Sequence, residues 1–284
     1  MKIGLVDIDS KIPNLALMKL SSFHKGLGDT TELTSPLFAS GFDKVYASKV
    51  FSWDDPPVLP DGSELGGYGW DMGSSLPEEV EHTVPDYDLY GMNRSMGFTT
   101  RGCVRKCSFC AVSKTEGDIR PHTEIDEFVR HRDVILMDNN IIAHPHGIEQ
   151  LEKLAKGRHR VDILQGVDVR LVDRSIAKVL GKSLFINPLR LACDSDGVVP
   201  AFKKAVTLLR EENVTPKRYS AYVMVKELES GLRRIEELKS IDVDPFVQPF
   251  RDREGTPIPS DLKRLARWAN HKAIYKTVKW EDYN

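Results

Sequence analysis

From residue 96 onward the chain alternates between short apolar runs, typical of buried β-strands, and longer amphipathic stretches, typical of helices. The runs are rich in Val, Ile and Leu, as in strands that are covered on both faces of a parallel sheet. Strands are expected at 96–100, 134–137, 161–165, 189–193, 221–225 and 245–249, and helices at 124–131, 147–156, 174–181, 200–212 and 229–240. Six strands joined by five crossover helices predict an α/β fold wound in one sense, and a partial (β/α)6 barrel over residues 95–258 is its natural closure.

Residues 1–52 predict a small α/β unit of their own. An alternating apolar strand at 2–8 is followed by a helical stripe at 12–27, and further strands are expected at 30–33 and 44–51. Residues 53–94 change character, because Gly, Pro and aromatic residues replace any clear periodicity. Disordered linkers are poor in aromatic residues, so this connector is expected to be ordered. It either straps across the barrel or lines a substrate cavity, in which case Glu78, Glu79, Asp86 and Tyr87 are candidate polar contacts.

The C-terminal tail, residues 259–284, begins as an amphipathic helix with Leu262, Leu265, Ala269 and Ala273 on one face. Its Lys and Arg residues are interleaved with Trp268, Tyr275 and Trp280. Basic residues interleaved with aromatic ones can bind RNA or single strands. A solvated helix that packs on the edge of the barrel explains the same pattern, so both interpretations stay open.

Three of the four cysteines lie between residues 102 and 111, as Cys103, Cys107 and Cys110, in a C-x3-C-x2-C pattern just after the first barrel strand. Three thiolates on so short a loop must surround one metal centre. Structural zinc and ferredoxin-type clusters take four protein ligands, and no fourth cysteine lies nearby. The triad therefore suits an iron–sulfur cubane with one iron left open, while His122 leaves a Cys3His zinc site as the alternative.

With the aromatic Phe109 before its last cysteine, this motif resembles the signature of the radical S-adenosylmethionine enzymes. The resemblance implies that the three thiolates hold a 4Fe–4S cluster whose open iron chelates S-adenosylmethionine. One electron, supplied by a reductant such as flavodoxin or ferredoxin, would cleave the sulfonium, and the resulting 5′-deoxyadenosyl radical would abstract hydrogen from a substrate. In the family, Phe109 would lie against the cluster and present its backbone to the adenine.

The sequence before the cysteines is similar to the branch of this family that carries cobalamin-binding N-terminal domains. The similarity covers residues 76–79, 85–87 and 97–103. Here the N-terminal unit is shorter and lacks an Asp-x-His-x-x-Gly pattern for cobalt, so no cobalamin is expected. His24 is instead expected on the solvent-facing side of its helix.

Polar residues follow the expected strands at their carboxyl ends, where functional groups gather in parallel α/β folds. By the family resemblance, Asp138 would accept a hydrogen bond from the methionyl ammonium, and Asn139 or Asn140 would bond the carboxylate or the ribose. Capping of a helix or turn is the alternative for all three. Asp194, after the fourth strand, is a further candidate for cofactor binding.

The third strand leads into Gln165, Asp168 and Arg170. Arg170 offers a fork for a carboxylate of the substrate or of methionine, while Gln165 and Asp168 could hold ribose hydroxyls. If the strand continued, a period of two would place Asp168 and Arg170 on one side of it. An ordinary ion pair between Asp168 and Arg170 is the alternative.

Composition leaves the partner open, because 40 basic and 42 acidic residues give a formal net charge of −2. The first apolar run breaks too early for a signal peptide or a membrane span, so a cytoplasmic protein without membrane association is expected. Cys193 is expected to be a small core residue. The leading hypothesis is a radical S-adenosylmethionine enzyme acting on a small molecule, a peptide or RNA. Its rivals are a zinc-stabilised nucleic-acid-binding protein without catalysis and an RNA-modifying enzyme of the same fold.

Overall fold

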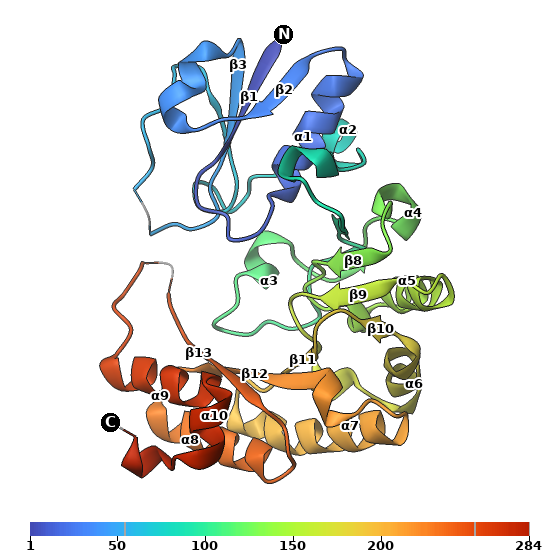
Figure 1. Cartoon of the computed structure of the whole chain (residues 1–284), viewed down its shortest axis with the longest axis vertical. Coiled ribbons are helices and arrows are strands. Elements are labelled where there is room, and N and C mark those ends of the chain that lie inside the picture. Colours follow the sequence, from blue (N-terminus) through green and yellow to red (C-terminus); the bar gives the residue numbers. More distant parts are fainter. Residues whose placement is uncertain (54, 253, 284) are drawn as a thin grey trace. The chain divides into compact units, whose positions relative to one another are not determined.

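The computed structural model describes residues 1–53, 55–252 and 254–283 (Figure 1). The described chain divides into two compact units. The first contains Met1–Gly97 and Thr123–Val134, with a short segment near residue 255, and the second contains Phe98–His122, Ile135–Asp252 and most of the C-terminal tail. The N-terminal boundary therefore differs from the expected one at residue 52, since the connector belongs to the first unit.

The first unit is built on a parallel sheet with the strand order β2-β1-β3-β4. Its strands are β1 (Lys2–Asp7), β2 (Thr30–Leu33), β3 (Lys44–Ser48) and β4 (Glu64–Gly66). Helix α1 (Leu15–Gly26) begins at Asn14, whose side chain accepts a hydrogen bond from the Leu17 backbone N–H. The predicted β–α–β–β order is confirmed, and the connector adds β4 to it because this segment pairs with β3.

One expectation in the first unit is wrong about where a side chain points, and one candidate contact of the connector has a structural partner. His24 is buried, since its ring nitrogens lie 2.8 Å from Asp29 and 3.0 Å from the Tyr46 hydroxyl. Its helix position alone suggested solvent. Asp86 Oδ2 accepts a hydrogen bond from the Ser21 hydroxyl and forms an ion pair with the Lys25 ammonium, each at 2.6 Å. Its carboxylate therefore holds the connector against α1.

Other connector residues also form local structure within the first unit. The Tyr87 hydroxyl donates to the Phe128 carbonyl at 2.7 Å. Glu78 and Glu79 begin the single-turn helix α2 (Glu78–Glu81), which is followed by η2 (Tyr87–Tyr90). These contacts confirm that the connector is ordered, and they are made within the first unit.

The second unit contains two parallel arrays where one continuous sheet was expected. The strands are β8 (Asp133–Leu136), β9 (Arg160–Ile163), β10 (Leu184–Phe185), β11 (Leu189–Ala192), β12 (Tyr219–Val225) and β13 (Pro245–Pro249). One sheet contains β10, β9 and β8 in that order, and the other has the order β11-β12-β13. A parallel bridge between Val167 and Leu191 links the two arrays, and Arg190 of β11 also donates to the Ile163 carbonyl of β9 at 3.0 Å. The strands occupy the expected positions, but they do not form one continuous six-stranded sheet.

The first expected barrel strand, 96–100, is split into β5 (Ser95–Gly97) and β6 (Thr100–Arg101). β6 pairs antiparallel with β7 (Arg120–Pro121) rather than joining a parallel sheet. The expected helix at 124–131 is the four-residue α4 (Ile125–Phe128). Apolar content predicted both elements but could not show where the backbone turns.

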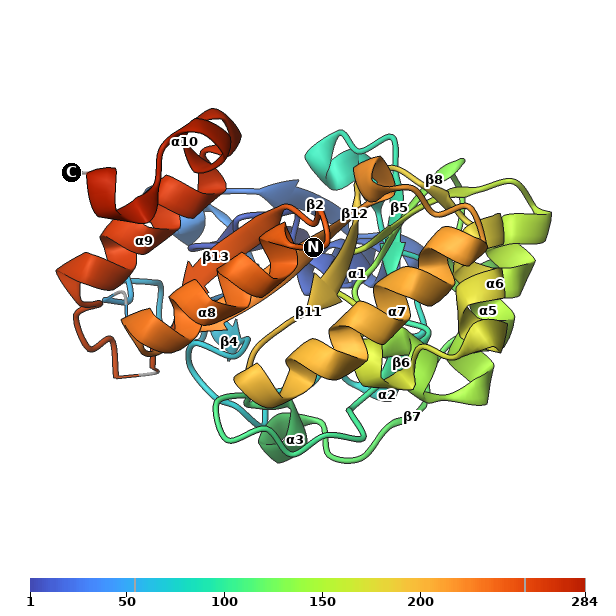
Figure 2. The same cartoon turned by 90° about the horizontal axis from the view of Figure 1, so that it is seen from below.

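The remaining helices follow the predicted alternation. They are α5 (Pro145–Lys156), α6 (Arg174–Lys182), α7 (Val199–Glu211) and α8 (Leu228–Lys239). Figure 2 shows α5, α6 and α7 in succession, with α8 following α7. On β12, Tyr219, Ala221, Val223 and Val225 are buried while the alternate residues are partly exposed, so one face of this strand carries the core. Cys193 is fully buried beside it, as expected of a core residue.

The tail forms α9 (Ser260–Asn270) and α10 (Lys272–Thr277). Leu262, Leu265 and Ala269 are buried as predicted, whereas Ala273 is exposed because the helix breaks at His271. Trp268 is buried, and Trp280 packs edge-on against it with ring centroids 5.7 Å apart. These aromatic side chains serve packing, which favours the interpretation as a packed edge helix over an RNA-stacking surface.

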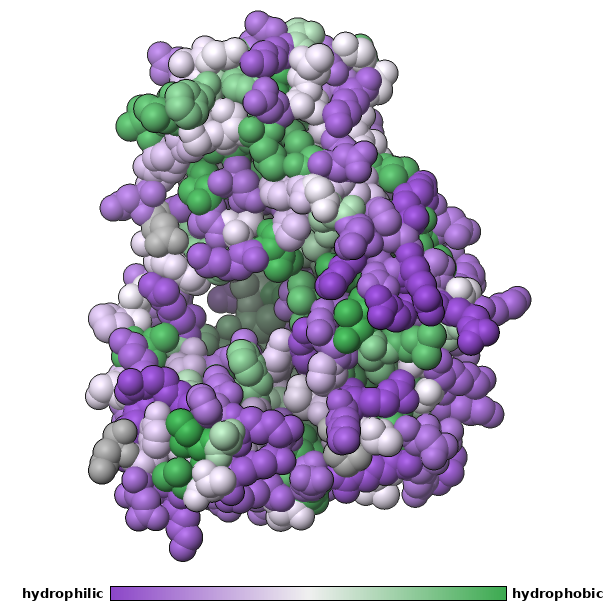
Figure 3. Space-filling model, in the orientation of Figure 1, coloured by the Kyte–Doolittle hydropathy of each residue, from purple (hydrophilic) through white to green (hydrophobic). Residues whose placement is uncertain are grey.

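Hydrophilic side chains cover most of the face seen in Figure 3, and hydrophobic ones form scattered patches. None of the helices within the described ranges is both long and apolar enough to cross a membrane.

Candidate functional site

The three clustered cysteines lie on a closed loop of the second unit. The paired strands β6 and β7 form its stem, with Arg101 opposite Arg120. Above them the Cys103 backbone N–H donates to the Gly117 carbonyl at 3.2 Å. Gly102 has φ +82°, and a Cβ there would lie 2.3 Å from the Asp118 carbonyl oxygen. A glycine is therefore required where the chain enters the loop.

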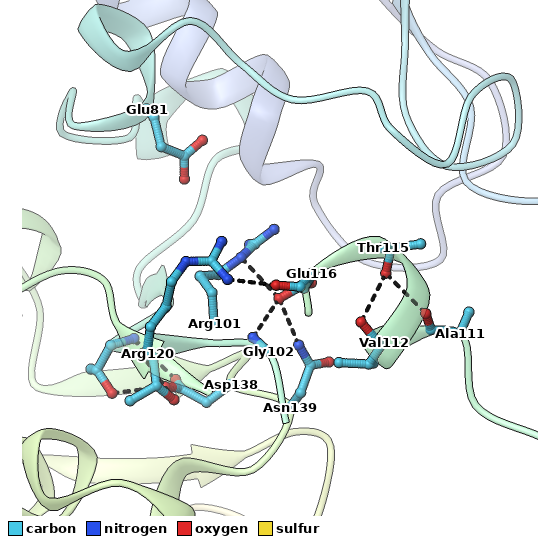
Figure 4. Close-up of polar contacts among 12 residues, drawn as sticks. Glu81, Arg101, Gly102, Ala111, Val112, Thr115, Glu116, Arg120, Asp138 and Asn139 are labelled. Carbon is cyan, nitrogen blue, oxygen red and sulfur yellow. Dashed lines mark hydrogen bonds and ion pairs between the residues drawn. The ribbon is translucent and has the colours of Figure 1, made fainter. Parts of the chain in front are cut away.

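Glu116 fastens the two ends of this loop to β8 (Figure 4). Its Oε2 accepts hydrogen bonds from the Gly102 backbone N–H and from Asn139 Nδ2, both at 2.9 Å. The Arg101 guanidinium lies 3.1 Å from the same oxygen. One carboxylate oxygen thus joins the start of the loop, its end and the segment after β8.

Asp138 holds the segment that leads into β6. Its side chain is fully buried, and Oδ1 accepts from the Thr99 and Thr100 hydroxyls at 2.7 Å each. The backbone N–H groups of Thr99 and Thr100 donate to the same oxygen at 3.1 and 2.5 Å. Burial raises the pKa of the Asp138 carboxyl, although the hydrogen bonds from Thr100 and Thr99 oppose this. The carboxylate thus has protein donors, and these come from the segment that leads into β6 and not from a helix or turn next to Asp138.

Asn140 completes this set, because its side chain reaches the cysteines themselves. Its Nδ2 donates to Cys103 Sγ at 3.6 Å, and the Arg105 backbone N–H donates to the same sulfur at 3.4 Å. The Asn140 side chain is 3% exposed, and its Oδ1 is buried without a hydrogen-bond partner in the described chain. The consecutive residues Asp138, Asn139 and Asn140 therefore bind three different points on or next to the cysteine loop.

The three thiols are half-buried and close enough to affect one another. Burial raises the pKa of the Cys110 thiol, and Cys107 and Cys103 raise it further, while a hydrogen bond from the Val112 backbone lowers it. The Cys110 backbone N–H donates to the Cys107 carbonyl at 3.0 Å, which turns the chain between these two residues. The loop thus has a tight turn between its second and third cysteines, and the three thiols lie near enough for Cys103 and Cys107 to act on the pKa of Cys110.

A cluster of charges ties the loop to the segment after β9. Asp168 accepts from Arg105 Nε and from Arg170 Nε, each at 2.7 Å. Although burial works to raise the pKa of Asp168, the hydrogen bonds from Arg170 and Arg105 outweigh it and hold that pKa below its usual value. The hydrogen bond to Asp168 raises the pKa of Arg170, against burial, and Cys107 adds to this rise. The ion pair between Asp168 and Arg170, which was the alternative interpretation, is present, and Arg105 joins it to the cysteine loop.

The spacing argument required strand β9 to continue to Arg170, but the strand ends before this residue. The chain leaves β9 at Ile163, passes Gly166 with φ +91°, and forms the 3-10 turn η4 (Val169–Leu171). The Asp168 side chain caps this turn by accepting from the Arg170 backbone N–H. Asp168 and Arg170 therefore meet through a turn and not through the period of a strand.

The other predicted site residues lie at separate positions on the same unit. Gln165 is exposed. Burial raises the pKa of Asp194, although the Met224 backbone N–H, 3.3 Å away, donates to its Oδ1 and lowers it. Asp194 also raises the pKa of Cys110, so its carboxyl lies near the cysteine loop. Phe109 is half-buried, and the Lys226 ammonium lies 5.8 Å from its ring centroid.

The donor set can be compared with the two candidate metal centres. In the described parts of the chain, no group of three or more His, Cys, Asp or Glu side chains is arranged to hold a single metal ion. A zinc site needs four donors at about 2.0–2.3 Å from one point, so the zinc alternative with His122 finds no support in this geometry. An iron–sulfur cluster spans several iron atoms, so its thiolates need not converge on one point. Three half-buried thiols, N–H donors to one sulfur and a fastened loop fit such a cluster.

The complete chain can also be compared with known proteins. No protein-family model matches the sequence, and no curated protein sequence does either. Two solved structures of OxsB, a cobalamin-dependent S-adenosylmethionine radical enzyme, resemble it. One holds aqua-cobalamin and S-adenosylmethionine and aligns with TM-score 0.54 at 12% identity, and the other holds aqua-cobalamin and aligns with TM-score 0.57 at 11% identity.

The chain shares its fold with these OxsB structures. In both alignments 97% of the chain is matched, so the likeness includes the N-terminal unit as well as the predicted barrel. The chain spans 56% of the length of OxsB. At 11–12% identity the comparison establishes the architecture and not the reaction.

Sequence reasoning missed four residues that hold this site together. Glu116 lies in the loop with no neighbouring pattern to mark it, and Arg105 was part of the cysteine motif without an assigned role. Thr99 and Thr100 carried a signal, because two hydroxyl residues interrupt the end of an expected buried strand. Their partner Asp138 becomes evident only when β8 is placed beside them.

Proposed function

We propose that this protein is a radical S-adenosylmethionine enzyme that binds a 4Fe–4S cluster through Cys103, Cys107 and Cys110. The observation that carries the proposal is the fastened three-cysteine loop, which lies in a chain with the matching fold. When bound, the cluster and S-adenosylmethionine would supply one-electron cleavage of the sulfonium and a 5′-deoxyadenosyl radical for hydrogen abstraction.

The residues around the loop would divide the work of holding the two groups. Asp138 and Asn139 would keep the loop in place, since their side chains already bond Thr99, Thr100 and Glu116. Asn140 retains an unpaired, buried Oδ1, which makes it the best-placed acceptor of the three for a donor group of S-adenosylmethionine. An unsatisfied buried acceptor costs about 1–3 kcal/mol, so a ligand donor would be bound favourably there.

Other groups would orient the cofactor and the substrate. Asp194 and Gln165 would accept from ribose hydroxyls, and Phe109 would shield the cluster from water. Arg170 would orient the loop beside the substrate, because its Nε and Nη2 are bound to Asp168 and its guanidinium also contacts Cys107. The electron would come from a protein reductant such as flavodoxin or ferredoxin, and an oxygen-sensitive cluster suits the reducing cytoplasm.

Anaerobic reconstitution with iron and sulfide tests the proposal directly. The protein should become brown with about four irons per chain, and it should release 5′-deoxyadenosine and methionine when S-adenosylmethionine and dithionite are added. A variant with Cys103, Cys107 and Cys110 all replaced by alanine is the matched control and should do neither. A colourless protein that binds a single zinc ion would refute the proposal and favour the zinc alternative.

A further inference from the structure

The side chain of Asn140 makes an unusual contact, because it is a buried amide that points its N–H group at a cysteine sulfur. Nδ2 lies 3.6 Å from Cys103 Sγ, which is within hydrogen-bonding range for sulfur. A thiolate accepts hydrogen bonds and cannot donate them, so the amide must turn its NH2 group, and not its oxygen, toward this atom. With 3% of the residue exposed, water does not compete for the contact.

The three sulfur atoms differ in the partners that surround them. Cys103 Sγ receives two neutral N–H donors, Asn140 Nδ2 and the Arg105 backbone N–H. Cys107 has the charged Arg170 as its neighbour, and Cys110 has the Val112 backbone N–H together with the acidic Asp194. Asn140 is thus a neutral side chain that donates to one of the three sulfur atoms. Its replacement by an apolar residue removes a donor and leaves the charge of the site unchanged.

Hydrogen bonds to the sulfur ligands are one of the factors that set the reduction potential of an iron–sulfur cluster. Reduction adds a negative charge that is shared with the thiolates, so an N–H donor stabilises the reduced form more than the oxidised form. The effect is larger where the contact is buried, since little solvent screens it.

Resting on the proposed function, we infer that Asn140 is a positioning residue that raises the reduction potential of the cluster through its N–H···S hydrogen bond to Cys103. Asn139 has a different role although it is adjacent and chemically identical. Its Nδ2 bonds Glu116, at the base of the loop, and among the described residues it makes no bond to a sulfur. The pair Asn140 and Asn139 therefore separates tuning of the cluster from fastening of the loop.

The experiment measures midpoint potentials of reconstituted variants by redox titration, with the electron paramagnetic resonance signal of the reduced cluster as the readout. Asn140→Leu removes the donor at similar volume, and Asn140→Asp replaces it with a negative charge. We expect the reduction equilibrium to weaken about tenfold in Asn140→Leu, a fall of about 59 mV for one electron. Asn140→Asp should fall further. The wild-type Fe–S stretching frequencies should shift in D2O, and this shift should shrink in Asn140→Leu.

Asn139→Leu is the matched control, which should melt at a lower temperature with its potential unchanged. An unchanged potential in Asn140→Leu, or an equal shift in Asn139→Leu, would overturn the inference. Loss of the cluster from both Asn140 variants would also overturn it, because Asn140 would then hold the loop and not tune the sulfur. A wild-type protein that takes up no 4Fe–4S cluster would refute the proposed function together with this inference. A cluster with unshifted potentials in the variants would refute the inference alone.

Discussion

Asp138 was expected to bind the methionyl ammonium, yet its surroundings predict a structural role that one substitution can test. In Asp138→Ala the backbone N–H groups of Thr99 and Thr100 lose their acceptor in a fully buried place. Each unsatisfied buried donor costs about 1–3 kcal/mol, and removal of one partner from a buried charged network typically costs about 3–5 kcal/mol. We expect the substitution to destabilise the second unit by about 3–5 kcal/mol.

That loss corresponds to a fall in melting temperature of roughly 6–20 °C, since a domain of this size loses about 2–4 °C per kcal/mol. Asp138→Asn provides the matched control. All four of the closest donor contacts are to Oδ1, whereas Oδ2 accepts from the Thr99 N–H at 3.2 Å. An amide can place its oxygen at the Oδ1 position and keep those four bonds, so Asp138→Asn should cost about 1 kcal/mol.

Thermal unfolding of the cluster-free proteins, followed by circular dichroism, measures both values. Calorimetric titration of S-adenosylmethionine into the reconstituted proteins then separates the two roles. A wild-type melting temperature in Asp138→Ala, combined with a ten- to hundredfold loss of affinity, would show that Asp138 contacts the cofactor and that the structural reasoning is wrong.

Four further outcomes are expected. Alanine at any one of the three loop cysteines should abolish cluster binding, and a full cluster in one of these variants would refute the ligand assignment. The control Cys193→Ala should leave the iron content unchanged and cost about 1 kcal/mol of stability. Glu116→Gln keeps the size of the side chain but weakens an oxygen that accepts from three donors. Limited proteolysis should therefore cut the cysteine loop faster than in wild type. An unchanged cutting rate would contradict the role of Glu116 in fastening the loop. Burial works to raise the pKa of Asp244, but the hydrogen bonds and charges of Lys272 and Lys276 together outweigh it and lower that pKa. The stabilisation is therefore present above the unfolded value, about pH 4, and is lost as the pH falls through the folded value. The gap in melting temperature between wild type and Asp244→Asn should close on acidification, and a constant gap would refute the ion pair. Incubation with cobalamin should give no stoichiometric corrinoid absorbance, because His24 is already bound to two protein groups; a one-to-one corrinoid complex would contradict this.

Much of the element order could be predicted from periodicity alone. The strands at 189–193, 221–225 and 245–249 and the helices between them are found within a few residues of their expected bounds. These segments are long, apolar on one side and separated by clear breaks, so local sequence determines them. Where β5 and β6 interrupt the expected strand at 96–100, the outcome depends on the partners of Thr99 and Thr100, which are 38 or 39 residues away in sequence.

The sequence by itself determined the cysteine spacing and the polar residues after each strand, because both are properties of short segments. Only the tertiary structure decided what those polar side chains do. Asp138, Asn139 and Asn140 are consecutive, yet they reach Thr100, Glu116 and Cys103, which come from three different places in the loop. A side chain binds whatever the fold brings within about 3 Å of it, and that neighbour is set by the packing of β8 against the loop and not by the residues beside it in the chain.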